Sequence, residues 1–210
     1  MQKRPSASLV TSHIEGHLSQ CPPDTVSAVT LFGWAFDVAE RKLSESLPRR
    51  WSHVQGVAER ARSLRTAAGE EADLLESAAI LHDVGYAPDI ATTGFHPLDG
   101  AVFLRSIEAP DRLVHLVAHH SYAELEAGLR GLSAELSEFT DERGPIRDAL
   151  WYCDLNTTPD GEEVDARDRI AEIKQRYGPG HLVTTFITEA APELLAAVDR
   201  TRQRAEAAVS

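Results

Sequence analysis

From Leu31 onward, apolar residues recur three and four positions apart, which is the spacing of one face of an α-helix. No stretch keeps up the two-residue alternation that is typical of a half-buried strand. The pattern therefore predicts an all-α protein. Residues 1–28 mix Pro, Ser, Thr and Gly without clean periodicity, so we expect a flexible N-terminal arm there and one multi-helix domain over residues 29–210.

Proline and glycine mark the expected helix boundaries. Pro48 suits the first turn of a helix, and we expect that helix to run to about Ala68 and to end at Gly69. Pro192 should kink or break the last helix. One further helix is expected to end at Gly85, and a short helix is expected directly after His96. Four more are expected over these ranges: Pro110 to His120, Pro145 through Asp154, Val164 to Tyr177, and His181 to about Ala208. The polar stretch from Glu124 to Gly144 is expected to form a surface helix and loop.

The chain has 210 residues, of which 42% are apolar and 26% charged, enough for one well-cored domain. Its formal net charge of -12 argues against a nucleic-acid-binding protein, because that affinity comes largely from Lys and Arg neutralising phosphates. The two cysteines, Cys21 and Cys153, are typical of reduced thiols in a cytosolic protein. No signal-peptide core and no 18-residue apolar run occurs, so we expect a soluble, cytoplasmic protein.

The adjacent pair His82 and Asp83 stands at the end of the apolar run LLESAAILHDVG. A buried imidazole beside a buried carboxylate is costly unless each is hydrogen-bonded or coordinated to a metal, so both need partners. Other apolar helical segments offer candidate partners, namely His53, His96, His119, His120 and Asp154.

Four of these residues come from three separate predicted helices: His53, His82, Asp83 and Asp154. Neutral imidazoles and ionised carboxylates that converge from different segments are what a metal-hydrolase site requires. Because consecutive helical residues diverge by about 100°, His82 and Asp83 can share a site only at its rim or by bridging two metals. Any one of these residues alone is more often a satisfied core residue, a cap or an ion-pair partner, so the hypothesis depends on the whole set.

This order of His, His-Asp and Asp resembles the HD superfamily of metal-dependent phosphohydrolases, whose name comes from the central dipeptide. The likeness covers roughly residues 45 to 160, which would form the metal-site core. The resemblance implies a compact HD-domain helical bundle, with the remaining C-terminal helices added to it.

The resemblance also implies a second metal position, because many members carry two further histidines between the His-Asp pair and the final Asp. Here His96 opens the segment HPLDGA, and His119 and His120 close the segment VAHHS. His120 is the expected ligand, since in similar sequences the ligand directly precedes a small hydroxyl residue, here Ser121; Asp83 would bridge the two ions. The implied ligands are His53, His82, Asp83, His96, His120 and Asp154, for one or two divalent ions among which Fe, Mn, Mg, Co and Zn are not distinguished.

The predicted activity is metal-assisted hydrolysis of a phosphate ester or anhydride in a nucleotide-like small molecule. Asp83 and His119 are the predicted catalytic residues, and Asp89, Arg105 and Arg130 are candidates for secondary roles. The alternative is that His119 or His120 only caps a helix C-terminus. The expected partner is a small phosphorylated substrate, not a nucleic-acid polymer or a membrane, and the pattern does not indicate an oligomeric state.

Two other functions remain open at this point. The same ligands suit a di-iron oxygenase of the HD superfamily, because imidazole and carboxylate bind iron as well as manganese. Some oxidative relatives place a carboxylate where this chain has Arg49, which disfavours that alternative. The other is a non-catalytic nucleotide-binding HD domain. The loop GYAPDIATTGF lacks the basic residue that some branches use to hold phosphate, which leaves the substrate open.

Overall fold

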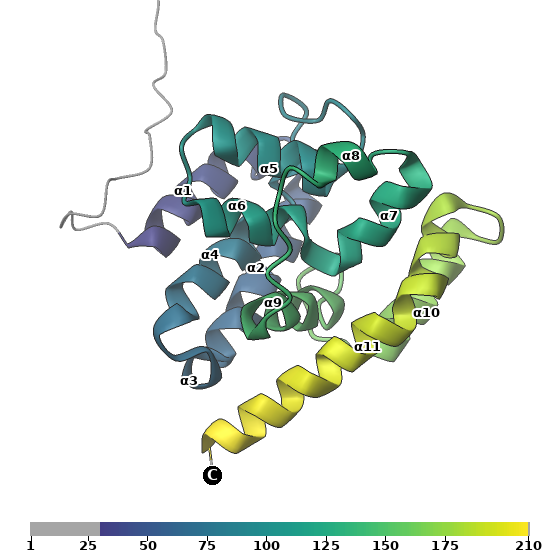
Figure 1. Ribbon diagram of the computed structural model, residues 1–210. Helices are drawn as coiled ribbons and strands as arrows, with labels where there is room; N and C mark the ends of the chain where they lie inside the picture. Colours follow the sequence, from purple (N-terminus) through teal and green to yellow (C-terminus); the bar gives the residue numbers. More distant parts are fainter. Residues whose placement is uncertain (1–29, 210) are drawn as a thin grey trace, which may run out of the picture.

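The computed structural model describes residues 30–209, and within that range it contains helices, loops and one isolated β-bridge between Thr157 and Glu163. The prediction of an all-α fold is confirmed (Figure 1). The first α-helices are α1 (Leu31–Leu43), α2 (Pro48–Ser63), α3 (Arg65–Ala68), α4 (Ala72–Leu81), α5 (His96–Ser106) and α6 (Asp111–Ala118). They are followed by α7 (Ala123–Arg130), α8 (Ser133–Leu136), α9 (Pro145–Leu155), α10 (Ala166–Tyr177) and α11 (Leu182–Val209). The expected N-terminal arm, residues 1–28, lies outside the described residues.

Helix α4 occupies the centre of the larger hydrophobic core. Its sequence ADLLESAAIL is apolar on nearly every side, and a helix of that kind is stable only when it is buried. Leu75, Ile80 and Leu81 have no exposed surface, and α4 packs against α1, α2, α6 and α9. Burying each such side chain stabilises the fold by about 1.5–3 kcal/mol. The His82-Asp83 pair at the end of α4 is therefore held inside the protein.

A second core joins α9, α10 and α11. Trp151 and Leu155 of α9 pack with Ile170 of α10 and with Phe186 and Leu194 of α11. α10 and α11 lie side by side as a helical hairpin along the edge of the bundle (Figure 1). This hairpin packs against α9, on one side of the bundle that contains α4.

The structure corrects two helix boundaries next to the site. The helix expected from Pro48 to Ala68 leaves α-helical geometry at Leu64, and its last residues form the separate helix α3. The helix expected to reach Gly85 ends at Leu81, and a 3-10 turn follows over Val84–Tyr86. Asp83 lies in the bend between them, at φ -99° and ψ 9°. This bend brings the chain round to the start of α5.

Pro192 does not divide the last helix, so of the predicted kink or break, the break is wrong. α11 continues through Pro192 as one helix from Leu182 to Val209. Ala190 and Leu194 are buried on either side of the proline in the second core. Packing on both sides offsets the backbone hydrogen bond that proline cannot donate.

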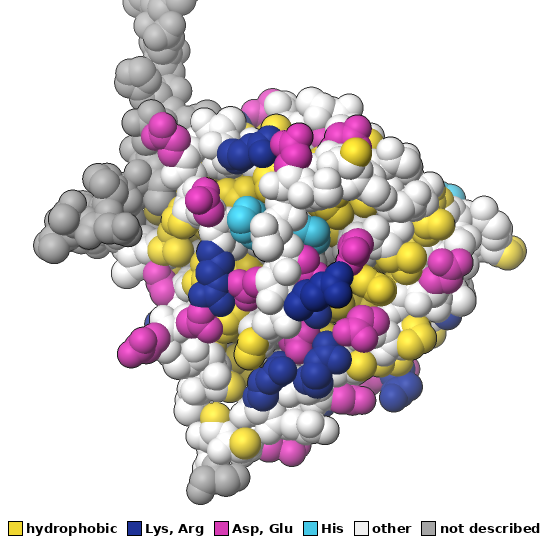
Figure 2. Space-filling model, in the orientation of Figure 1, with side chains coloured by type: hydrophobic (Ala, Val, Ile, Leu, Met, Phe, Trp, Pro, Cys, Tyr) yellow, Lys and Arg dark blue, Asp and Glu magenta, His cyan; other side chains and the backbone are white. Residues whose placement is uncertain are grey.

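Other expectations concern the surface of the described residues. The polar stretch after Glu124 forms α7, α8 and a loop, as expected. No helix between residues 30 and 209 combines the length and the apolar character needed to cross a membrane. On the face shown in Figure 2, acidic and basic side chains are interspersed, without a continuous basic area.

Candidate metal centre

Three helices bring the four central residues of the prediction together. His53 lies on the face of α2 that also buries Val57, one turn further on. His82 is the first residue after α4, and Asp154 lies in the last turn of α9. Because α4 packs against both α2 and α9, these side chains meet at one end of the bundle core.

The first group of possible ligands contains His53, His82 and Asp154, and their ligand atoms all lie within 4.8 Å of one another. The Oδ1 atom of Asp154 is 3.1 Å from Nε2 of His53 and 3.7 Å from Nε2 of His82. Ser121 donates a hydrogen bond from its hydroxyl to the other oxygen of Asp154. We call this group the first trio.

The second trio contains Asp83, His96 and His120, again with all ligand atoms within 4.8 Å. Nε2 of His96 is 3.2 Å from Oδ1 of Asp83 and 3.0 Å from Nε2 of His120. The Nε2 atom of His120 is 4.0 Å from the same Asp83 oxygen. The structure thus brings His96 and His120 to Asp83, where the resemblance placed them.

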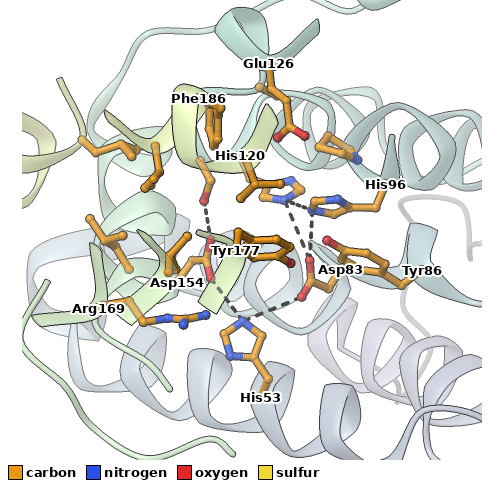
Figure 3. Close-up of a pocket in the computed structure, with 18 of the residues that line it drawn as sticks. His53, Asp83, Tyr86, His96, His120, Glu126, Asp154, Arg169, Tyr177 and Phe186 are labelled. Atoms are coloured by element: carbon orange, nitrogen blue, oxygen red, sulfur yellow. Dashed lines mark hydrogen bonds and ion pairs between the residues drawn. The ribbon is translucent and has the colours of Figure 1, made fainter. Parts of the chain in front are cut away.

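Asp83 lies between the two trios. Its Oδ1 faces the second trio, while its Oδ2 is 3.7 Å from Nε2 of His53 and 3.5 Å from Nε2 of His82 in the first. Figure 3 shows the side chains of His53, His96 and His120 directed toward this carboxylate from different sides. A carboxylate in that position can offer one oxygen to each of two ions.

Backbone carbonyls determine which ring nitrogen of three histidines is free to bind a metal. Nδ1 of His53 is 2.9 Å from the Thr158 carbonyl, Nδ1 of His82 is 2.7 Å from the Ala79 carbonyl, and Nδ1 of His120 is 2.6 Å from the Val117 carbonyl. A carbonyl only accepts, so each Nδ1 carries the proton. In the neutral ring Nε2 then keeps its lone pair, as in known metal sites.

The protein atoms alone leave this arrangement incomplete. Nε2 of His82 is buried and has no hydrogen-bond partner among the described residues. A buried polar atom without a partner is costly, and a metal ion would satisfy it. Imidazole nitrogens with carboxylate oxygens suit divalent transition metals. The six residues therefore fit one or two such ions.

The charges in the cluster shift several pKa values. Burial raises the pKa of Asp83, but the charges of Arg50 and His82 lower it by more. The net pKa lies well below its usual value, so the carboxyl stays ionised. Burial lowers the pKa of His82, but Asp83 and Asp154 raise it to about 9. Burial and the neighbouring His96 and His82 lower the pKa of His120 to about 3. The metal-free cluster therefore holds ionised carboxylates together with protons that an ion would replace.

One side of the centre opens into a cavity of about 340 Å³, within the usual size of small-molecule sites. His53, Asp83, His96, His120 and Asp154 line this cavity. Arg130 lines it too, and its Nη2 pairs with Oε1 of Glu126 at 2.6 Å. A small molecule in the cavity would reach both trios.

The sequence reasoning missed two cations at this site. Nη1 of Arg50 is 2.6 Å from Oδ2 of Asp83, and its guanidinium lies 4.1 Å from the ring centre of Tyr86. Arg169 of α10 is buried, lines the cavity and points toward the side of Asp154 and His53 (Figure 3). Arg50 could have been noticed because it lies nearly one helical turn before His53, whereas nothing in the sequence places Arg169 there.

His119 does not reach the cavity, contrary to its predicted catalytic role. Its Nε2 lies 2.8 Å from the carbonyl oxygen of Phe139, and its own carbonyl accepts a hydrogen bond from Trp151. α6 ends at Ala118, and His119, at φ -110° and ψ 18°, leads into the 3-10 turn that begins at His120, so the two adjacent histidines face different neighbours. The position of His119 indicates a structural role.

Two other candidates for secondary roles also lie away from the cavity. Asp89 pairs with Lys42 at 2.5 Å, and Arg105 pairs with Glu138 at 3.0 Å. Neither residue lines the cavity. Of the three secondary candidates, the structure brings only Arg130 to it.

The fold and the two trios together define a helical domain with two groups of residues that could hold a metal ion. The family model described as HD domain matches residues 50–173, more than half of the chain. The chain therefore belongs to the HD domain family, whose superfamily consists mostly of metal-dependent phosphohydrolases. No curated protein and no solved structure matches the chain.

Proposed function

We propose that this protein is a metal-dependent phosphohydrolase that acts on a phosphate ester or anhydride of a nucleotide-like small molecule. The observation that carries the proposal is the position of Asp83, with one oxygen toward each trio and the cavity beside it. Divalent ions, when bound, make water a stronger nucleophile at neutral pH and neutralise charge on phosphoryl oxygens.

The residues around the trios suit a phosphorylated ligand. Arg50 and Arg169 line the cavity beside the ligand carboxylates, and guanidinium groups bind phosphate oxygens with two parallel hydrogen bonds. Arg130 lies on the same cavity and is partly exposed. These cations can hold the phosphoryl group against the trios.

The size of the site supports a small substrate. A cavity of about 340 Å³ takes a molecule of nucleotide size but not a folded polymer. The net charge of -12 also disfavours a polyanion, which would be repelled by the protein as a whole. The cations at the cavity act locally, where one or two phosphates can reach them.

Phosphate release from a panel of nucleotides and simple phosphate esters tests the proposal. The protein is loaded with Mn²⁺ and assayed without oxygen, next to Asp83→Ala and to Asp89→Ala, an exposed carboxylate outside the cavity. We expect release by the wild type and by Asp89→Ala, and loss of both metal and release in Asp83→Ala.

Three outcomes would contradict the proposal. Normal phosphate release by Asp83→Ala would show that the metal centre takes no part in the reaction. Turnover that requires oxygen would favour the di-iron oxygenase. Tight nucleotide binding without turnover anywhere in the panel would favour a non-catalytic binding domain.

A further inference from the structure

The helical hairpin of α10 and α11 forms one side of the cavity. Arg169, Ile173 and Tyr177 of α10 line it at positions four residues apart, which places them on one face of the helix. Val183 and Phe186 of α11 line it as well, and their spacing of three residues also places them on one helix face. The two helices thus turn a shared face toward the metal trios.

Most of this face is apolar, although Arg176 and His181 of the same hairpin also line the cavity, next to the Tyr177 ring. We call Ile173, Tyr177, Val183 and Phe186 the apolar wall. Tyr177 is 41% exposed, and Ile173 and Val183 are partly exposed, so this part of the wall is not already covered by the protein. Phe186 also lines the cavity and is buried in the second core. An open apolar surface inside a cavity favours a ligand that covers it.

The cavity is therefore polar at one end and apolar along one side. The polar end holds the two trios, Arg50 and the buried Arg169. Figure 3 shows Tyr177 and Phe186 on the same cavity as these charged groups. A ligand that fits must carry its negative charge at one end and an apolar group at the other.

Most of the apolar wall lies outside the residues that match the family. The HD domain match ends at residue 173, whereas Tyr177, Val183 and Phe186 come after it. The trios lie inside the matched residues. The residues that would bind metal thus lie within the family match, and most of the apolar wall lies beyond it.

We propose that the apolar wall selects, among the phosphorylated small molecules of the proposed function, those that also carry a planar, largely apolar ring beyond the phosphoryl group. The ring packs against Tyr177 and Ile173, above Phe186, while the phosphoryl group faces the trios. This inference rests on the proposed function, because it assigns the phosphoryl group to the metal centre. Aromatic contacts favour flat rings over sugars, whose hydroxyl groups would lose their hydrogen bonds to water there.

Binding of two phosphonates tests the inference without any turnover, because a carbon-phosphorus bond is not hydrolysed as an ester is. Methylphosphonate and benzylphosphonate are titrated by calorimetry into the Mn²⁺-loaded protein. We expect benzylphosphonate to bind about tenfold more tightly, since its ring buries apolar surface that the methyl group lacks. Equal affinities, or no binding of either compound, would overturn the inference.

Variants of the wall sharpen the test. Tyr177→Ala and Ile173→Ala should each reduce the preference for benzylphosphonate by about threefold, with unchanged affinity for methylphosphonate. Val102→Ala, which removes an exposed apolar side chain on α5 away from the cavity, should leave the preference intact. Equal weakening of both phosphonates in the wall variants would contradict a role in selecting the ring.

The two proposals fail in different ways. A preference for the benzyl compound that depends on the wall, with no phosphate release from any ester, overturns the proposed function and leaves the wall as a ligand-binding surface. Phosphate release without a wall-dependent preference overturns the inference alone.

Discussion

The backbone of Gly85 lies so close to His96 that a Cβ atom on Gly85 would stand 2.1 Å from the His96 carbonyl oxygen. It would also stand 2.6 Å from the backbone nitrogen of Gly100. Only glycine allows the turn after Asp83 to approach the first turns of α5 in this way. This approach is what brings the imidazole of His96 to Asp83.

Gly85→Ala should therefore damage the second trio. The added methyl group must push α5 away, which we expect to lower the free energy of unfolding by about 1–3 kcal/mol and to remove one of two bound ions. Elemental analysis of the Mn²⁺-loaded protein measures the loss. Gly128→Ala on α7 is the control, because its Cβ would meet nothing closer than 3.9 Å. Two ions retained in Gly85→Ala would show that this contact does not position His96.

Ser121 positions Asp154 for the first trio through its hydroxyl hydrogen bond. Ser121→Ala should lower the metal affinity of that trio by about 10–100-fold, the usual effect of removing a group that orients a ligand. Competition with a chelating dye measures the affinity. Ser106→Ala removes an exposed hydroxyl that bonds only within α5, and should change nothing. Equal affinities in Ser121→Ala and the wild type would refute this role.

His119 should prove structural. His119→Leu leaves the Phe139 carbonyl without its donor, so we expect a loss of about 1–3 kcal/mol in unfolding free energy with normal metal content. His120→Leu should instead lose metal from the second trio. Chemical denaturation and elemental analysis of both variants separate the two roles. If the His119→Leu variant bound less metal than the wild type, His119 would be part of the metal site.

Asp148 should make the docking of α11 sensitive to acid. Burial raises the pKa of this carboxyl, but Arg200 and Arg204 of α11 lower it below its usual value of 3.8. A lowered pKa stabilises the fold above the unfolded value, and that stability is lost as the pH falls through 3.8 toward the folded value.

Asp148→Asn should therefore cost about 1–3 kcal/mol at pH 7, and the difference from the wild type should shrink below pH 4. Urea denaturation at a series of pH values measures both. The control is Asp160→Asn, because Asp160 forms an exposed pair with Arg49, and its stability should follow the wild type. If the loss of unfolding free energy in Asp148→Asn were the same at every pH, the ion pairs of Asp148 with Arg200 and Arg204 would be excluded as its cause.

The sequence predicted the helices and the central residues of the candidate site because both depend on local patterns. Apolar spacing identified α4, and its burial places His82 and Asp83 in the core wherever the other helices lie. His53 and Asp154 were found because each belongs to an apolar helix face that must pack inward. Local pattern was therefore enough for the first trio.

The rest of the site depends on geometry that no local pattern contains. The choice between His119 and His120 depends on where α6 ends, because His119 leaves α-helical geometry and its ring meets the Phe139 carbonyl, whereas the His120 ring faces Asp83. Arg169 and Tyr177 reach the cavity only because the α10 and α11 hairpin folds back over α9. Pro192 was expected to kink or break the last helix, and the helix does not break because packing on both sides of the proline outweighs one lost hydrogen bond.

The central claim is that the two trios hold two ions with Asp83 between them. Anomalous diffraction from crystals soaked with Mn²⁺ tests it most directly. The account predicts two peaks on either side of the Asp83 carboxylate, about 3.5–4 Å apart, one contacting His53, His82 and Asp154 and the other His96 and His120. Peaks only at surface carboxylates, or no peak beside Asp83, would contradict it.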